Sequence, residues 1–220
     1  IEKLNVSGLF IGSGFRFGKD AAGDTEFLKK FFSPRGVKVN EVPILKIMGK
    51  PVSSTSVREF YSSGDIESIK LFLGRDPSIK GRVIKGDSRG RLLGYPTANI
   101  DVFEKYVTPS DGVYAGLINL KAGIVCTDHK AEDKRDRDLI KMMPSVINIG
   151  DNPTFAGQRK WIESHVLNFS GDIYGYDIEV IFLKKLRDEK KFKSRDELIK
   201  QIEKDIIAAG EYFELMKGSQ

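Results

Sequence analysis

Glycines and arginines alternate over a short stretch of this sequence. In chain order they are Gly86, Arg89, Gly90, Arg91 and Gly94. Glycine lets a backbone turn tightly and approach a ligand, and the amides of successive turns form a concave site for phosphate oxygens. The two arginines would add charge-assisted hydrogen bonds to the same anion. A glycine-rich hairpin without a ligand would also explain the pattern, so both interpretations stay open here.

Two neutral oxygen side chains follow this stretch. Thr97 and Asn99 stand two residues apart behind Pro96, so on an extended segment they share one face. Such oxygens suit Mg²⁺, which keeps several waters and bridges substrate phosphates. The pair therefore predicts a magnesium site next to bound phosphate, unless the segment is only the end of a hairpin.

A candidate proton acceptor lies in the stretch from Trp161 to Phe169. On a strand, Glu163 and Leu167 share a face, so an inward Leu167 would bring Glu163 inward as well. An inward carboxylate is costly unless it is paired or functional, and beside a phosphate it could accept a proton from an attacking hydroxyl. An exposed glutamate on a strand is the alternative. His165 is expected to be a core or hydrogen-bonding histidine, because no partner cluster of metal ligands accompanies it.

The third candidate is the charged stretch from Leu186 to Phe192. Arg187 could bind an anion or a flat ring, and Phe192 could stack on one. A solvated charge run with one anchoring aromatic explains the stretch without a ligand.

The first 75 residues predict alternating strands and helices, which is α/β patterning. Ser53, Ser54 and Thr55 are possible N-caps of a helix through Tyr61. Asp65 is a possible cap of another helix, which would end at Gly74. The earlier elements are expected at Val6–Ile11 (strand), Thr25–Phe32 (helix) and Val37–Leu45 (strand).

Short apolar runs separated by turn residues follow Pro77, and they predict a barrel or sandwich. The strands are expected at Ile79–Ile84, Val113–Leu120, Ser145–Ile149, Ile162–Phe169 and Ile178–Leu183. The domain boundary is placed near Arg75–Pro77, giving domains 1–75 and 76–220. The mixed charges of 128–138 predict a solvated hairpin extension or mobile loop.

The last segment predicts a helix that packs on the barrel. Ser194 and Glu197 have the spacing of a capping box. Apolar residues then recur at helical intervals, at Leu198, Ile202, Ile206, Ala209, Phe213 and Met216.

Composition excludes several classes of protein and of site. The chain has 220 residues, 40% apolar and 30% charged, with a net charge of +5, which is weak evidence for a nucleic-acid partner. No apolar run approaches the roughly 20 residues that span a bilayer. The single Cys126 excludes an internal disulfide framework and a multi-cysteine zinc site, and makes a cytoplasmic location the simplest prediction.

Taken together, the motifs of residues 77–220 resemble riboflavin kinase (flavokinase) in order and spacing. They are Gly86-x-x-x-Gly90-Arg91-x-Leu93-Gly94-Tyr95-Pro96-Thr97-Ala98-Asn99, Asn148-x-Gly150-x-x-Pro153-Thr154-Phe155, Glu163-x-His165, Asp172-x-Tyr174-Gly175 and Leu186-Arg187-x-Glu189-x-x-Phe192. The resemblance implies a six-stranded antiparallel barrel with a C-terminal helix. It also implies that riboflavin and Mg-ATP give FMN and ADP.

The resemblance also implies roles for the motif residues. The loop of residues 86–94 and Pro96 would cover the ATP phosphates, and Thr97 and Asn99 would hold Mg²⁺ and the terminal phosphates. Glu163 would take the proton of the ribityl hydroxyl. Flavin binding would fall to Arg187, Glu189 and Phe192.

The N-terminal part resembles the second half of a bacterial FMN adenylyltransferase domain. Gly14-Phe15-Arg16-Phe17-Gly18 matches its glycine-aromatic stretch, and Ser53-Ser54-Thr55-Ser56-Val57-Arg58 matches a signature whose Ser, Thr and Arg58 would lie near triphosphate. The histidine motif that normally opens this domain is missing, because neither His129 nor His165 can supply it. We therefore expect an incomplete nucleotide-binding α/β domain that does not adenylylate FMN.

Two other functions stay open on the sequence alone. A small-barrel nucleic-acid-binding module would normally show exposed aromatics interleaved with lysine and arginine on one strand face, and no such stripe is present. A flavin-binding regulatory protein without catalysis would not need Thr97, Asn99 and Glu163. We expect no nucleic acid and no membrane among the partners.

Overall fold

The computed structural model describes residues 5–86, 90, 93–103, 106–120, 141–151 and 160–218. The chain divides into two compact units between Ser56 and Val57. The predicted assignment of 1–75 and 76–220 to separate domains stays a prediction. The charged stretch 128–138 lies outside the described residues.

The first unit is built on a two-stranded parallel sheet, β1 (Gly8–Gly12) with β2 (Lys38–Val42). Helix α1 (Thr25–Phe32) connects the strands and begins as predicted, because the Asp24 side chain accepts the Phe27 backbone N–H at 2.9 Å. Strand β2 ends earlier than predicted, before Pro43, which has no N–H to donate. The remaining elements of this unit are η1 (Lys19–Ala21), η2 (Ser33–Arg35), β3 (Lys46–Ile47), β4 (Lys50–Pro51) and the start of α2 (Ser54–Ser63).

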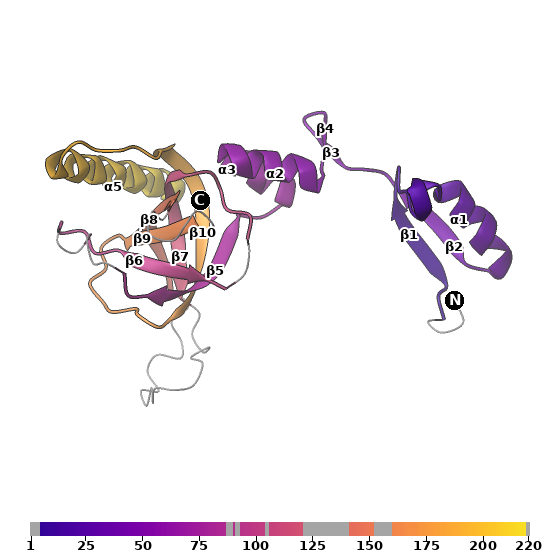
Figure 1. The fold of residues 1–220 in the computed structure, drawn as a ribbon, viewed down its shortest axis with the longest axis horizontal. Coiled ribbons are helices and arrows are strands. Elements are labelled where there is room, and N and C mark those ends of the chain that lie inside the picture. Colours follow the sequence, from indigo (N-terminus) through magenta and orange to yellow (C-terminus); the bar gives the residue numbers. More distant parts are fainter. Residues whose placement is uncertain are drawn as a thin grey trace, which may run out of the picture. The chain divides into compact units, whose positions relative to one another are not determined.

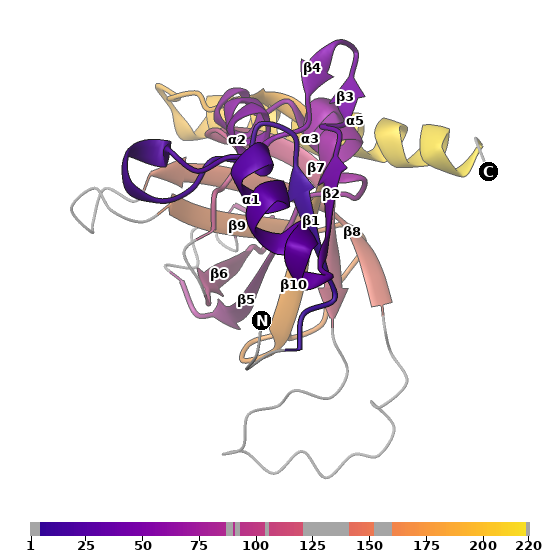
Figure 2. The same ribbon diagram turned by 90° about the vertical axis from the view of Figure 1, so that its right-hand side faces the viewer.

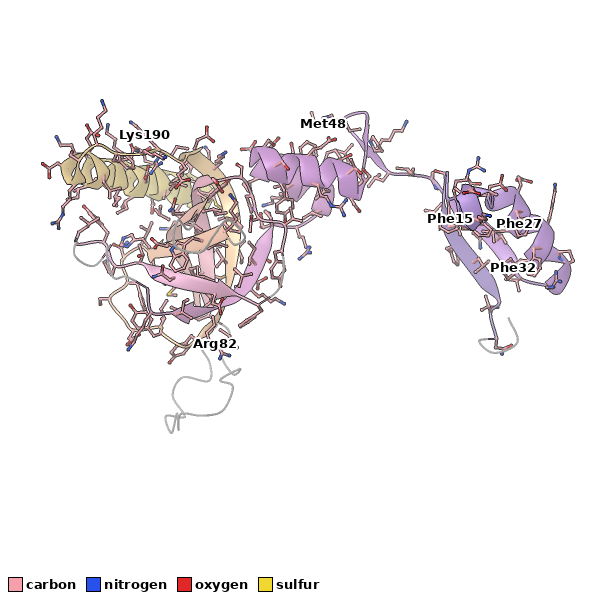
Figure 3. The ribbon with its side chains drawn as sticks, in the orientation of Figure 1. Phe15, Phe27, Phe32, Met48, Arg82 and Lys190 are labelled. Atoms are coloured by element: carbon pink, nitrogen blue, oxygen red, sulfur yellow. The ribbon has the colours of Figure 1, made fainter. Side chains whose placement is uncertain are left out.

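Aromatic rings line up along α1 and the loop before it. Phe15 stacks on Phe17 with centroids 5.8 Å apart, and Phe17 meets the edge of Phe27 at 5.9 Å. Figure 3 shows Phe15 and Phe27 in this unit. Both side chains are largely exposed, so these ring contacts form at the surface and not in a core.

Helix α3 (Ile66–Leu73) has both predicted end signals. Asp65 accepts the Ser68 backbone N–H at 3.0 Å, and Gly74 closes the helix with a left-handed φ of 67°. Ile66 and Ile69 are buried in the core of the second unit, so α3 packs on the barrel.

Six antiparallel strands close into the predicted barrel, in the order β10-β5-β6-β9-β8-β7 (Figure 1). They are β5 (Ser78–Ile84), β6 (Ala98–Val102), β7 (Gly112–Leu120), β8 (Lys141–Asp151), β9 (Lys160–Val166) and β10 (Asp177–Asp188). Apolar side chains that alternate along the strands fill the interior, with Tyr114 and Phe182 as the largest. Strand β6 was not among the strands predicted from apolar runs.

Helix α5 (Arg195–Lys217) runs across the outside of the barrel (Figure 2). Its predicted capping box is present in modified form: Ser194 accepts the Glu197 N–H at 3.2 Å, while Glu197 accepts the N–H of Lys193. Ala209 and Phe213 pack on the outer face of the barrel with Ala115 and Leu183. No described helix is both long and apolar enough to span a bilayer.

Candidate functional site

The pairing of β6 with β9 brings two predicted site residues together. Asn99 lies directly opposite Glu163, and opposite residues of antiparallel strands share a face with Cβ atoms about 5 Å apart. Their neighbours Ala98, Ile100 and Ile162 belong to the barrel interior, so Asn99 and Glu163 lie on the outer face.

This placement corrects the idea that Leu167 and Glu163 would both point inward. The inward residues of β9 are Ile162, Ser164 and Val166. Leu167 instead packs in the cluster beneath α5, because the helix gives apolar residues of the outer face a cover of their own.

The register extends this pair into a row of residues on the outer face. Asn148 lies opposite Glu163, Val113 opposite Asn148, and Arg187 opposite Val113. Asn99, the candidate base Glu163 and Arg187 of the third candidate segment therefore lie on one outer row, which consists of Asn99, Glu163, Asn148, Val113 and Arg187.

Two of the predicted glycines pack against the two oxygen side chains. A Cβ on Gly86 would lie 1.9 Å from Asn99 Nδ2, and one on Gly90 would lie 3.0 Å from Thr97 Oγ1. Gly94 has a φ of 89°, which a side chain would strain. The glycines therefore allow close approach to Thr97 and Asn99. Arg89 and Arg91 lie outside the described residues.

Asn99 is 3% exposed, and its Oδ1 has no hydrogen-bond partner among the described residues. Leaving a buried acceptor unpaired costs about 1–3 kcal/mol. A buried, unpaired amide oxygen two residues from a threonine fits a hard cation that arrives with its ligand.

Glu163 is held by a residue that the sequence analysis did not single out. The Trp161 indole N–H donates to Glu163 Oε1 at 2.7 Å. The two residues stand two positions apart on β9 and share its outer face, a spacing that could have revealed the contact. The bond fixes one carboxylate oxygen and leaves Oε2 for another partner.

The Tyr95–Asn99 segment is tied to the barrel and to α5. His165 Nδ1 makes a hydrogen bond of 2.9 Å with the Pro96 carbonyl, which confirms the expected hydrogen-bonding role. The Tyr95 hydroxyl donates to Glu203 Oε1 at 3.2 Å. Desolvation is the larger cause of the raised pKa of Tyr95, and the hydrogen bond with Glu203 raises that pKa further.

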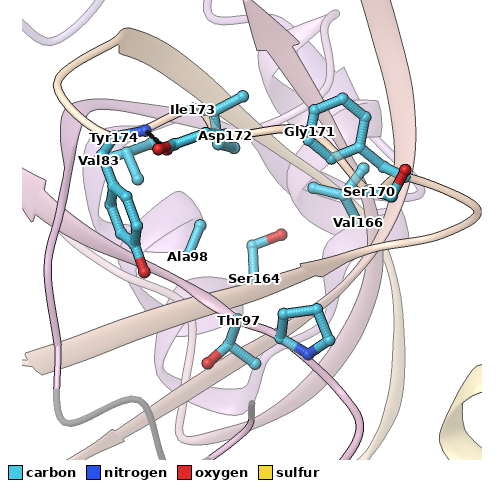
Figure 4. A pocket seen from close by; sticks show the side chains of 12 residues that line it. Val83, Thr97, Ala98, Ser164, Val166, Ser170, Gly171, Asp172, Ile173 and Tyr174 are labelled. Atoms are coloured by element: carbon cyan, nitrogen blue, oxygen red, sulfur yellow. Dashed lines mark hydrogen bonds between the residues drawn. The ribbon is translucent and has the colours of Figure 1, made fainter.

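A cavity of about 450 Å³ opens beside Thr97 (Figure 4). Its buried lining residues come from the barrel interior and the 169–174 loop. The Asp172 carboxylate accepts the Tyr174 N–H at 2.9 Å and so shapes that loop. The lining residues are Val83, Pro96, Thr97, Ala98, Ser164, Val166, Phe169, Ser170, Gly171, Asp172, Ile173 and Tyr174.

The third candidate segment is anchored to α5. Arg187 Nε and Nη2 bind Asp205 at 2.9 and 2.8 Å, and Gln201 donates to the same carboxylate at 2.9 Å. The Phe192 ring centroid lies 5.8 Å from Arg187 Cζ. Glu189 lies close to Gly150, where an added Cβ would be 2.8 Å from its Oε1. Flavin contacts by Arg187, Glu189 and Phe192 stay a prediction.

The Ser-Ser-Thr signature has the helix-capping geometry. The Ser53 hydroxyl accepts the Ser56 N–H at 3.2 Å at the start of α2. Ser54, Thr55 and Arg58 are exposed on that helix. The proximity of these residues to a triphosphate stays a prediction.

Two family models match separate parts of the chain. Residues 73–213 match the family model "Riboflavin kinase", and residues 1–56 match the model "FAD synthetase".

Curated relatives match over almost the whole chain. It is 36% identical over 217 residues to the bifunctional riboflavin kinase/FMN adenylyltransferase of Escherichia coli K12, covering 99% of this chain and 64% of that protein. It is 35% identical over 213 residues to the protein of the same name from Haemophilus influenzae, covering 97% and 63%. The chain thus spans less than two thirds of the length of these relatives.

Among solved structures, the crystal structure of a macrolide-efflux protein from Streptococcus pneumoniae is similar. The TM-score is 0.72 at 29% sequence identity, over 89% of this chain and 58% of that chain.

Proposed function

Because this chain belongs to the riboflavin kinase family, we propose that it phosphorylates riboflavin. The γ-phosphoryl group of ATP passes to the ribityl 5′-hydroxyl, so that one P–O bond forms, the bond to ADP breaks, and FMN and ADP leave. The observation that carries the proposal is the direct pairing of Asn99 with Glu163 beside the cavity that Thr97 lines.

Glu163 acts as the general base in this proposal. Trp161 holds Oε1, which leaves Oε2 to accept the hydroxyl proton as the oxygen attacks phosphorus. Positioned general bases contribute about 10²–10⁴-fold to a rate, while phosphoryl transfer depends mainly on positioning and on charge stabilisation.

Thr97 and Asn99 are the residues that would hold Mg²⁺. The fit rests on the unpaired buried Oδ1 of Asn99 and on the close backbone approach at Gly86 and Gly90. When bound, the ion would neutralise charge on the phosphates. The 86–94 loop and Pro96 would cover those phosphates.

The cavity beside Thr97 suits the nucleoside of ATP. Its walls combine buried apolar residues with the partly exposed 169–174 loop, as expected of a pocket that encloses a flat, largely apolar ring. Phosphates at Thr97 would leave the nucleoside to enter this space.

The flavin would lie at the other end of the outer row. Glu189 and Phe192 flank that end, and Arg187 would help mainly by holding the segment against Asp205. In this proposal the reacting hydroxyl reaches Glu163 from the α5 side of the barrel.

We do not expect this chain to convert FMN to FAD. The FAD synthetase model matches residues 1–56, and in this part Ser53 is engaged in capping α2. A cytoplasmic location, where ATP and riboflavin are both present, completes the proposal.

The test incubates the protein with riboflavin, ATP and Mg²⁺ and separates the flavins by chromatography. FMN alone is the expected product. FMN followed by FAD would show that the N-terminal part adenylylates. Bound riboflavin without FMN would reject the kinase in favour of a flavin-binding regulatory protein.

The Thr97→Ala variant tests the metal assignment. It should weaken binding of Mg-ATP more than binding of riboflavin, because it removes an oxygen from the proposed ion site. The reverse order would reassign Thr97.

A further inference from the structure

Ser164 is a buried polar residue in the cavity beside Thr97. It is 1% exposed, and its Oγ has no hydrogen-bond partner among the described residues. Its strand neighbours are Ala98 on β6 and Ile147 on β8, both in the apolar interior. An unpaired hydroxyl in such surroundings destabilises the folded state, so its presence calls for a partner that binds later.

The cavity supplies the space for that partner. Figure 4 shows Ser164 at the centre of the cavity, between Ala98, Val166 and Thr97. Five of the lining residues are buried, and Ser164 is the polar one among Val83, Ala98, Ser164, Val166 and Ile173. A ligand that fills the deep end of the cavity therefore meets apolar walls and one hydroxyl.

We propose that Ser164 Oγ makes a hydrogen bond with the nucleoside of the phosphoryl donor. This inference rests on the proposed function for the placement of the phosphates at Thr97. With the phosphates there, the nucleoside occupies the deep end. A serine hydroxyl can donate and accept, so it can pair with a polar atom of the nucleobase or the ribose while Val83, Val166 and Ile173 cover the apolar faces.

The barrel contains a matched control. Ser145 is also fully buried in the barrel, but its Oγ donates to the Met143 carbonyl at 3.0 Å and it does not line the cavity. Replacing Ser145 by alanine removes an internal hydrogen bond, whereas the same change at Ser164 removes an unpaired group.

The experiment measures two quantities for Ser164→Ala, Ser145→Ala and the unchanged protein. Mg-ATP affinity is measured by isothermal titration calorimetry without riboflavin, and the melting temperature is measured without ligand. Ser164→Ala should weaken Mg-ATP binding about two- to twelve-fold, the range of one neutral hydrogen bond, and should raise the melting temperature. Ser145→Ala should lower the melting temperature and leave the Mg-ATP affinity unchanged.

A higher melting temperature together with weaker Mg-ATP binding in Ser164→Ala supports the inference. An unchanged affinity in Ser164→Ala would overturn it, and so would an equal loss in both variants, because that would indicate general loosening of the barrel. If the unchanged protein bound no Mg-ATP, the inference would fail as well.

FMN formation by the unchanged protein, assayed in parallel, separates this inference from the proposed function. Binding that depends on Ser164 without any FMN would keep the inference and reject the kinase. If the unchanged protein forms FMN and Ser164→Ala binds Mg-ATP with unchanged affinity, the kinase proposal is kept and the inference about Ser164 is rejected.

Discussion

The two compact units differ in how much of their apolar surface they bury. In residues 57–220 a closed barrel encloses Ile118, Ile147 and Phe182 with no measurable exposure. In residues 1–56 the buried hydrophobic side chains of the described residues are Leu28 and Val37, while Phe10 is 77% and Met48 89% exposed. A closed sheet covers its inner face and has no open edges, whereas two parallel strands and one helix cannot do so.

The difference shows why local order and a core are separate properties. The first unit has a capped helix, stacked rings and a regular parallel register, all of which depend on short-range contacts. The barrel is held by pairs far apart in the sequence, such as Ser78 with Glu179 and Arg82 with Asp177. A site that needs fixed distances between strands is therefore expected in the barrel.

The largest effect that would test this contrast is on catalysis. Glu163→Gln should lower the rate of FMN formation about 10²–10⁴-fold, because the amide cannot take the hydroxyl proton, while both substrates still bind. Initial rates and titrations of Mg-ATP and riboflavin measure this.

Two control variants accompany Glu163→Gln. Glu179→Gln changes a carboxylate on another barrel strand, β10, where it lies opposite Asn119 and Lys80. Thr55→Ala changes the first unit. Both should leave the rate unchanged. Near-normal turnover in Glu163→Gln would remove Glu163 as the base.

Core truncation should destabilise the barrel far more than a comparable change destabilises the first unit. Phe182→Ala should lower the free energy of unfolding by about 3–5 kcal/mol, because Phe182 is fully buried against Tyr114. Phe10→Ala should change it by less than about 0.5 kcal/mol. Trp161 is the single tryptophan and lies in the barrel, so its fluorescence in urea reports the barrel transition, while hydrogen exchange of the β1 and β2 backbone amides reports the first unit. Equal shifts from both variants would contradict the contrast.

Ion pairs should show the same contrast on a smaller scale. The Arg187–Asp205 side chains are 22% and 7% exposed, whereas Arg16–Asp24 are 59% and 39% exposed. Asp205→Ala should cost about 2–3 kcal/mol, because it leaves a largely buried guanidinium without its partner. Arg16→Ala should cost about 0–1 kcal/mol.

Urea unfolding followed by Trp161 fluorescence measures the barrel variant, and hydrogen exchange of the α1 backbone amides measures the variant in the first unit. Asp205→Asn keeps hydrogen-bond acceptance and should lie between Asp205→Ala and the unchanged protein. A cost for Arg16→Ala as large as that for Asp205→Ala would show that the surface pair is more than a local contact.

Local signals predicted the helices because each signal lies within its own element. Asp65 and Gly74 define α3, and Ser194 with Glu197 defines the start of α5. Strand β6 was missed because it is short and contains Asn99 and Asp101, and both residue types are depleted in strands. Its position is fixed by pairing with β5 and β9. The residues of β6 alone carry no signal for that pairing.

The candidate site was proposed from residue types and not from geometry. The pattern around Thr97, Asn99 and Glu163 indicated phosphate chemistry, but the face that Glu163 occupies follows from α5, which covers Leu167 on the outside. The Arg187–Asp205 pair likewise depends on where α5 lies. Register across a closed barrel and helix placement are long-range properties, and one sequence carries no direct signal for them.

The smallest expected effect concerns alkaline pH, which should act on the barrel through its buried tyrosines. All seven tyrosines lie after residue 56. Burial raises the pKa of Tyr114, which is fully buried and donates to the Ser110 carbonyl. The folded state keeps this phenol protonated above pH 10 while the unfolded state ionises. The stability it contributes is therefore complete below the unfolded pKa of about 10 and is lost as the pH rises through the folded pKa.

Urea unfolding between about pH 9 and 11 should show this loss in the Trp161 transition and a smaller slope in Tyr114→Phe. The phenylalanine variant starts from lower stability, because the Ser110 carbonyl loses its donor, so the slope with pH and not the absolute value is the measurement. Tyr61 and Tyr212 also have raised pKa values through burial, so part of the slope should remain. An unchanged slope in Tyr114→Phe would mean that the buried phenol does not couple barrel stability to pH.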